Sequence, residues 1–150
     1  MREILFRGKR CDNGEWAQGY YIRADHHWHN HGIHKDWITL GASANGGWFA
    51  LHNKYAVKAE TIGQFTGLTD KNGKKIFEGD IIEWFAQGES EHPDFGYIEY
   101  DEQSFAWRVC WQKYDPDFME GMQQEYISVI GNIHDNPDLL NGGAEDEKPL

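Results

Sequence analysis

The feature that most constrains this chain is a series of turn signals between short apolar segments, clearest at residues 64–85. Asn72-Gly73 supplies the positive φ angles that a tight hairpin turn needs, and Gly79-Asp80 marks a second turn. The segment that follows, residues 81–85, carries apolar residues at both alternating positions. We therefore expect a hairpin followed by a strand that is buried on both faces.

Further hairpins are predicted on either side of this segment. Residues 2–23 alternate around Asn13-Gly14, with Ile4 and Phe6 in the first strand, and residues 37–40 and 48–51 flank a Gly-rich turn at residues 45–47. Downstream, residues 97–100, 105–111 and 126–130 have the composition of strands. One face of the second of these is a stripe that predicts core, formed by Phe105, Trp107, Val109 and Trp111.

Helices are expected to be short. Residues 114–125 are ambiguous, because Asp115-Pro116 suits a helix start while Gly121 weakens the helix. Asn136-Pro137 is typical of the N-terminus of a single helical turn. No long helical pattern alternates with the strands, so a parallel α/β fold is not expected.

These patterns predict a mainly β fold: a small, barrel-like, highly curved antiparallel sheet with an N-terminal β-hairpin region and at most short helices. The aromatic content, 7 Trp, 7 Tyr and 8 Phe, suits half-buried pleated surfaces. We expect an N-terminal hairpin and His-rich connection region at residues 1–60, a barrel-like β core at 61–140, and a mobile acidic tail at 141–150.

Charge is distributed unevenly along the chain. Residues 1–60 hold 8 Lys and Arg against 6 Asp and Glu, and residues 61–150 hold 6 against 19. Such an acidic field repels phosphate backbones and acidic membrane surfaces, so nucleic acid and membranes are not expected partners.

The first residues and the cysteines lead us to expect a cytoplasmic protein. The apolar run within the first ten residues, MREILFRGKR, is too short for a secretory signal, and no stretch reaches the length of a membrane span. Cys11 and Cys110 are expected to stay as thiols inside a cell.

Four segments of the chain together resemble the YopX family of small bacteriophage and prophage proteins: MREILFRGK, DNGEWAQGYY, GQFTGLTDKNGKKIFEGDII and VIGNIHDNPDLL. The resemblance implies a predominantly β fold with a barrel-like body and an N-terminal hairpin region, a phage or prophage origin, and self-association. It supplies no reaction and no catalytic or binding residues.

Five histidines, at positions 26, 27, 29, 31 and 34, crowd into one segment outside that resemblance. On an extended chain His27, His29 and His31 share one side, where three imidazoles are able to hold Zn²⁺, Ni²⁺ or Cu²⁺, with Asp25 or Asp36 as a further ligand. The alternative is a solvent-facing polar loop, or histidines stacked on Trp28 and Trp37.

Catalytic patterns are weak elsewhere. Carboxylate pairs such as Glu78 with Asp80 are more typical of turns and surfaces than of acid and base catalysts, and Asp80 is expected to bond its own backbone. Cys110 lies among apolar residues, and no GxSxG or GxxxxGK motif occurs. The sequence favours a non-enzymatic protein with no required cofactor.

A third class of function is single-stranded nucleic-acid binding by a small barrel. The candidate residues lie in the mildly basic first part of the chain and are Lys9, Arg10, Tyr20, Tyr21, Arg23 and Trp28. The leading hypothesis is an accessory protein that binds protein, either itself as a homo-oligomer or a host factor, through β edges and exposed aromatic residues.

Overall fold

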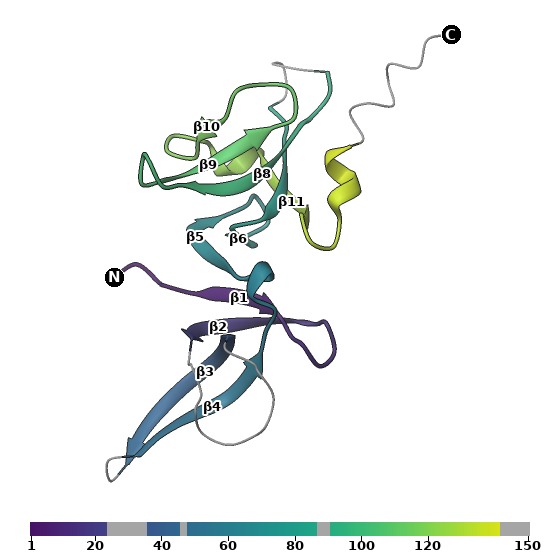
Figure 1. The fold of residues 1–150 in the computed structure, drawn as a ribbon. Coiled ribbons are helices and arrows are strands. Elements are labelled where there is room, and N and C mark those ends of the chain that lie inside the picture. The colour runs from purple at the N-terminus through teal and green to yellow at the C-terminus, as the bar shows by residue number, and fades with distance from the viewer. Residues whose placement is uncertain (24–35, 46–47, 87–90, 142–150) are drawn as a thin grey trace. The chain divides into compact units, whose positions relative to one another are not determined.

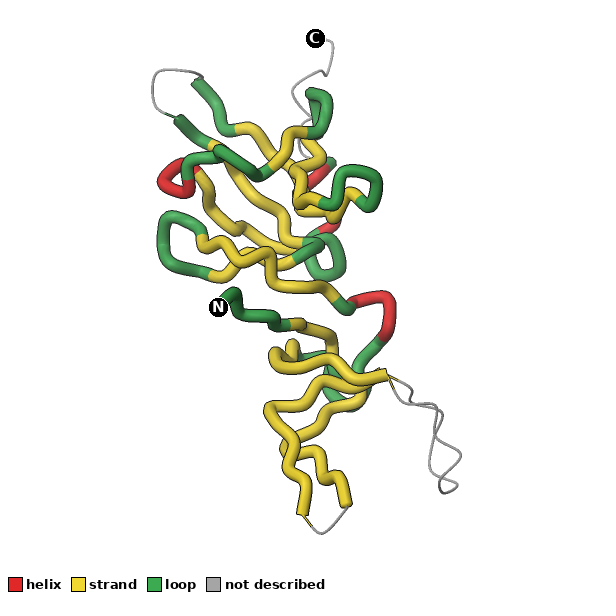
Figure 2. Tube along the Cα trace, turned by 90° about the vertical axis from the view of Figure 1, so that its left-hand side faces the viewer, coloured by secondary structure: helices red, strands yellow, loops and turns green. Residues whose placement is uncertain are grey.

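The structure, a computed structural model, describes residues 1–23, 36–45, 48–86 and 91–141 (Figure 1). The chain divides into two compact units, Met1–Phe65 (unit 1) and Thr66–Leu150 (unit 2). Strands dominate both units, and the helical elements are short 3-10 turns (Figure 2). The division at residue 60 that the sequence suggests stays a prediction.

Unit 1 is built on consecutive antiparallel strands. They are β1 (Phe6–Lys9), β2 (Trp16–Arg23), β3 (Asp36–Asn45), β4 (Trp48–Ala56) and the start of β5 (Gly63–Thr69). β1 pairs with β2 and β2 with β3, while β3 and β4 form a long hairpin (Figure 1). Both predicted N-terminal hairpins are thus confirmed. Ile4, which was expected within the first strand, precedes it and is exposed.

The core of unit 1 is small, with Ala17, Ile38 and Val57 buried at its centre. Close backbone approach holds its sheet together, because a Cβ on Gly19 would lie 2.3 Å from the carbonyl oxygen of Thr39. Only glycine fits at this position. The hydroxyl of Thr39, itself 1% exposed, donates to the carbonyl of His52 at 2.7 Å and ties β3 to β4.

Unit 2 begins with the hairpin that the turn signals predict. The end of β5 lies beside β6 (Lys75–Phe77), and Gly73 in the connecting turn has φ of +79°. The side chain of Asp70 organises this turn: Oδ1 accepts from the backbone N–H groups of Asn72 and Lys74 at 2.8 and 2.9 Å. Its Oδ2 accepts from the N–H of Val129 at 3.0 Å, which joins the turn to the last strand.

A five-stranded antiparallel sheet forms the body of unit 2, in the order β10-β9-β8-β7-β11. Its strands are β7 (Asp80–Trp84), β8 (Asp94–Asp101), β9 (Ala106–Trp111), β10 (Asp117–Phe118) and β11 (Ile127–Asn132). Ile81 and Ile82 of β7 are both fully buried, which confirms burial on both faces at these positions. Phe85, expected within the same strand, lies beyond its end and is 36% exposed. Asp80 accepts from the N–H of Phe77 at 2.8 Å, the backbone role expected of it.

The predicted stripe on β9 is correct at three of its four positions. Val109 is fully buried, and Trp107 and Trp111 pack against the core beside it. Phe105 is instead 81% exposed with φ of +55°, because it belongs to the turn between β8 and β9. The prediction that Phe105 belongs to the buried stripe is therefore wrong. Side chains alternate between the two faces only within the strand, which begins at Ala106.

The remaining described segments are turns, and no α-helix occurs among the residues that the structure describes. The 3-10 turns are η1 (Ala59–Thr61), η2 (Gln124–Tyr126) and η3 (Pro137–Leu140). The single turn at Pro137 is confirmed, although Asn136 does not cap it and accepts from the N–H of Asn132. Residues 142–150 of the expected tail lie outside the described part of the chain.

The mainly β fold and its antiparallel pairing are confirmed. The described strands form two antiparallel sheets and no closed barrel, so the barrel-like body stays a prediction.

Candidate binding groove

Strand register brings two tryptophans and a carboxylate together at one end of the five-stranded sheet. Trp84 of β7 is paired with Asp94 of β8, and Trp111 of β9 is opposite Gly96, two residues further along β8. Residues paired across an antiparallel sheet, and residues two apart along a strand, share one face. Trp84, Asp94 and Trp111 therefore lie on the face that carries the core of unit 2.

The segment that follows β9 crosses this face and is anchored by Met119. The side chain of Met119 is 3% exposed, and its N–H donates to the carbonyl of Trp107 at 3.0 Å. The chain then reverses at Gly121, where φ is +86°, and the N–H of Met122 donates back to the carbonyl of Met119 at 3.2 Å. This turn places Glu120 and Gly121 at the surface, next to the end of the sheet.

Between the sheet and the crossing segment lies a pocket of about 400 Å³, which we call the acidic aromatic groove. Its lining residues are Trp84, Asp94, Trp111, Tyr114, Asp117, Glu120, Gly121 and Met122. Two contacts hold its rings in place. The indole N–H of Trp111 donates to Asp117 at 3.0 Å, and Tyr126 packs edge-on against Trp84 with ring centroids 5.4 Å apart.

The lining of this groove is aromatic and acidic. It combines two indoles, a phenol and a thioether with three carboxylates, and no Lys, Arg, His, Ser or Cys is among the described residues that line it. Tyr114 is 61% exposed and presents its ring to solvent. Rings and carboxylates in one pocket favour ligands that carry a positive charge.

The opposite face of the same sheet carries an ion pair. Arg108 donates to Glu99 through Nε at 2.9 Å and Nη2 at 2.7 Å, and the thiol of Cys110 donates to the same oxygen at 3.2 Å. The hydrogen bonds from Arg108 and Cys110 lower the pKa of Glu99. Burial, followed by the hydrogen bond to Glu99, raises the pKa of Cys110, so its thiol stays protonated at neutral pH and is a poor nucleophile.

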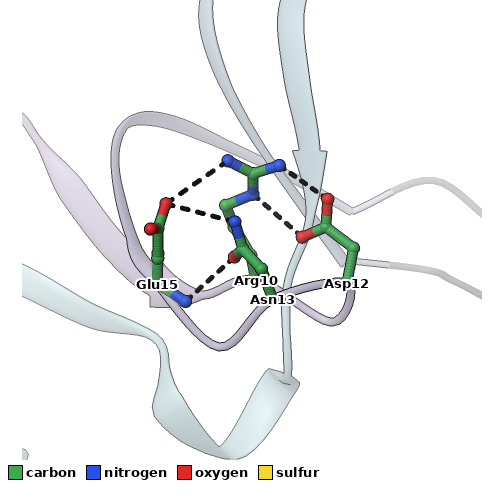
Figure 3. A network of polar contacts seen from close by, with 4 residues as sticks. All are labelled: Arg10, Asp12, Asn13 and Glu15. Carbon is green, nitrogen blue, oxygen red and sulfur yellow. Dashed lines mark hydrogen bonds and ion pairs between the residues drawn. The ribbon is translucent and has the colours of Figure 1, made fainter.

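Unit 1 offers a second surface, which combines rings with basic groups. Arg10 is held by Asp12 through Nε at 2.9 Å and Nη2 at 2.6 Å, and Glu15 lies 3.9 Å from its Nη1 (Figure 3). The guanidinium of Arg10 also stacks 4.3 Å from the ring centroid of Tyr55. The hydrogen bond between Arg10 and Asp12 raises the pKa of the first and lowers that of the second.

Arg10, Asp12 and Tyr55 border a pocket of about 460 Å³, which is also lined by Cys11, Trp37 and Lys54. The ammonium of Lys54 lies 5.4 Å from the ring centroid of Trp37. The guanidinium of Arg10 and the ammonium of Lys54 therefore both lie over aromatic rings of the same unit.

The sequence matches the model of the YopX protein family over residues 5–141. The chain belongs to the YopX family. Among solved structures, the crystal structure of protein EF1440 from Enterococcus faecalis is similar, with a TM-score of 0.55 and 24% identity over 93% of this chain and 99% of that chain. That likeness shows the shared fold. No curated protein matches the chain.

One of the segments that resemble the YopX family supplies two aspartates that accept hydrogen bonds from the backbone. Asp70 and Asp80 both lie in GQFTGLTDKNGKKIFEGDII, and both accept backbone hydrogen bonds while buried. Burial works to raise the pKa of Asp70, but the N–H groups of Val129, Lys74 and Asn72 outweigh it, and the net shift is downward. Asp70 and Asp80 of this segment thus have a structural role.

The predicted metal ligands His27, His29 and His31 lie outside the described residues, as does Asp25. Asp36, the other carboxylate considered there, accepts a hydrogen bond from the hydroxyl of Tyr21 at 2.6 Å. Within the described ranges, no group of three or more His, Cys, Asp or Glu is placed to hold a metal ion. The Zn²⁺ site stays a prediction.

Among the residues that the structure describes, the predicted nucleic-acid residues do not share one face, and Trp28 lies outside the described part of the chain. Tyr20 and Tyr21 are neighbours on β2 and point to opposite sides, so that Tyr20 is 57% exposed while Tyr21 packs beside Phe6. Lys9 lies over the ring of Trp16, and Arg10 over that of Tyr55. In the described part of the chain, no helix has the length and apolar character to cross a bilayer.

Proposed function

We propose that this YopX-family chain is a non-enzymatic phage or prophage accessory protein that binds protein inside the host bacterial cell. Its partner is a host factor or a second copy of the chain. The observation that carries this proposal is the acidic aromatic groove, where Trp84, Trp111 and Tyr114 line an open pocket with a charged rim.

The composition of the groove matches that of protein interfaces. Trp, Tyr and Met are enriched in such interfaces, and the residues that contribute most to binding cluster in pockets surrounded by a polar rim. Here Met122 and the two indoles form the apolar part, while Asp117 and Glu120 are exposed. An exposed ring such as Tyr114 gains most when a partner covers it.

The described titratable groups favour binding over catalysis. A general acid at neutral pH needs a carboxyl with a raised pKa, and a nucleophilic cysteine needs a lowered one. The pKa values of Glu99 and Cys110, which are hydrogen-bonded to each other, are shifted in the opposite directions.

A matched pair of tyrosine variants tests the proposal. Tyr114→Ala removes a ring of the groove, while Tyr20→Ala removes a ring of similar exposure from β2 of unit 1. Proteins captured from host lysate by the wild-type chain are identified, purified and titrated against all three forms, and light scattering measures self-association.

We expect Tyr114→Ala to weaken the interaction with the purified partner or with the second copy, and Tyr20→Ala to leave it unchanged. A strictly monomeric chain that binds no purified host protein contradicts the proposal. Equal binding by the two variants contradicts the assignment of the groove.

A further inference from the structure

In unit 1, two arginine side chains lie over aromatic rings. The guanidinium carbon of Arg7 lies 4.6 Å from the ring centroid of Trp16, and that of Arg10 lies 4.3 Å from Tyr55. Both distances are within the range in which the ring quadrupole attracts a cation. Arg10 adds carboxylate partners, since Asp12 and Glu15 flank the same guanidinium (Figure 3).

The acidic aromatic groove of unit 2 has the same surroundings without the cation. Its rings belong to Trp84, Trp111 and Tyr114, and its carboxylates to Asp94, Asp117 and Glu120, with no basic side chain among the described lining residues. Three carboxylates beside a low-dielectric aromatic surface produce a negative potential that a bound cation relieves.

We propose that the groove binds the guanidinium of an arginine side chain presented by a partner protein. The inference rests on the proposed function and names the chemistry that the partner must supply. The planar guanidinium stacks on the face of an aromatic ring while its N–H groups donate to carboxylates, so it uses both kinds of group that line the groove.

Other ligands fit the groove less well. Anions are repelled by its carboxylates, and a purely apolar side chain would leave Asp94, Asp117 and Glu120 without a partner of opposite charge. A lysine ammonium satisfies the carboxylates but is a compact, strongly hydrated charge that stacks less well on Trp than a guanidinium does.

The test uses capped tripeptides as probes, with the full-length chain labelled with nitrogen-15. The indole N–H signals of Trp84 and Trp111 report on the groove directly, because both rings line it. The probes are acetyl-Gly-Arg-Gly-amide, its lysine counterpart, and its citrulline counterpart, which keeps the shape of arginine without the charge. Free L-arginine is a fourth probe.

We expect saturable shifts of both indole signals with the arginine peptide, weaker binding of the lysine peptide, and no saturable shift with citrulline. Added NaCl should weaken binding, since salt screens the carboxylates. Equal shifts with citrulline and arginine overturn the proposal, as does the absence of saturation with the arginine peptide. Tighter binding of free arginine than of the peptide overturns the assignment to a partner protein.

Substitutions of exposed residues test whether the arginine peptide binds in the groove. Glu120→Gln and Tyr114→Ala alter the groove, whereas Glu102→Gln and Tyr20→Ala are exposed controls outside its described lining. Each groove variant should raise the Kd of the arginine peptide about threefold, as expected for the loss of one exposed cation–π or ionic contact. An unchanged Kd in both groove variants overturns the proposal.

Failure of this inference and failure of the proposed function give different results. If the chain binds a purified partner through Tyr114 but the arginine peptide has no effect, the function stands and the ligand chemistry is wrong. If the arginine peptide binds but no protein partner or second copy does, the ligand chemistry stands and the function is wrong.

Discussion

The two units use aromatic and charged residues in opposite ways. In unit 1, Arg10 lies over Tyr55 and is also paired with Asp12, so ring, cation and carboxylate all come from the same unit. In unit 2, Trp84 and Tyr114 line a groove with carboxylates and no described basic residue. Similar residue types therefore contact one another within unit 1 and line an open pocket in unit 2.

The units also differ in what holds their strands. Both units bring bare backbone close at a glycine: a Cβ would lie 2.3 Å from the carbonyl oxygen of Thr39 at Gly19 in unit 1, and 2.8 Å from that of Cys110 at Gly96 in unit 2. Unit 2 uses buried carboxylates as backbone acceptors, with Asp70 4% exposed and Asp80 1% exposed. We therefore expect substitutions and acid to act on the two units differently, and the predictions below run from the largest effect to the smallest.

Asp70→Ala should have the largest effect, because it leaves the N–H groups of Asn72, Lys74 and Val129 without their acceptor. At about 1–3 kcal/mol for each buried group left unsatisfied, a loss of roughly 4 kcal/mol in the free energy of unfolding is expected. Urea unfolding followed by assigned amide signals of each unit measures it. Equal loss of structure in both units would mean that they do not unfold separately.

Gly19→Ala is the counterpart in unit 1. Its Cβ would lie 2.3 Å from the carbonyl oxygen of Thr39, so β2 and β3 must separate. We expect a loss of about 2–3 kcal/mol, typical of overpacking against atoms that cannot move. The same urea experiment should show the amide signals of β2 and β3 lost first. Gly41→Ala, where a Cβ meets nothing within 4 Å, is the control.

Acid should destabilise unit 2 of the wild type by protonating Asp70. The Asp70→Asn variant should lack this contribution to the pH dependence. The folded pKa of Asp70 is lowered, so its contribution is fully present above its unfolded pKa, near 4, and is lost as the pH falls through the folded pKa. The stability difference between wild type and Asp70→Asn should therefore shrink below about pH 4. Thermal unfolding between pH 7 and pH 3 measures it, and a constant difference contradicts the role assigned to Asp70.

Gly121→Ala should act more weakly and close to the groove. Gly121 has φ of +86° and open space around its Cβ position, so the cost is that of the left-handed backbone alone, about 1–2 kcal/mol. Thermal unfolding gives the cost. Binding of the arginine peptide should also fall, because Glu120 and Met122 on either side of the turn line the groove.

Asp12→Asn should have the smallest effect on stability. Asp12 is exposed, and surface ion pairs contribute little because water screens both groups. Unfolding should be unchanged within error, while Arg10 loses its bidentate partner. If this variant bound the arginine peptide more weakly, the groove of unit 2 would not be the site.

The hairpins could be predicted from the sequence because their signals are local. Asn72-Gly73 fixes a turn whatever surrounds it, and the fully buried pair Ile81 and Ile82 follows from two neighbouring apolar residues. The alternation of side chains between the two faces of β9 could also be predicted, but Phe105 shows that alternation does not reveal where a strand begins.

The groove could not be predicted, since it depends on register between distant strands. Trp84, Asp94 and Trp111 meet only through the pairing of β7, β8 and β9, and the sequence alone suggests that such tryptophans are core. The acceptor role of Asp70 toward Val129 spans 59 residues and has no local signal. Asp115-Pro116 did not help either, because it suits a helix start, whereas the structure has the short strand β10 directly after it.

The two cysteines differ in a way that makes the chain convenient to label. Cys11 is exposed, whereas Cys110 is partly buried, donates to Glu99 and has a raised pKa. Because maleimides react with the thiolate, a brief reaction at neutral pH should modify Cys11 and leave Cys110 as the free thiol. A single dye can thus be attached to unit 1 of the natural sequence, with no substitution and no change to the residues of the groove.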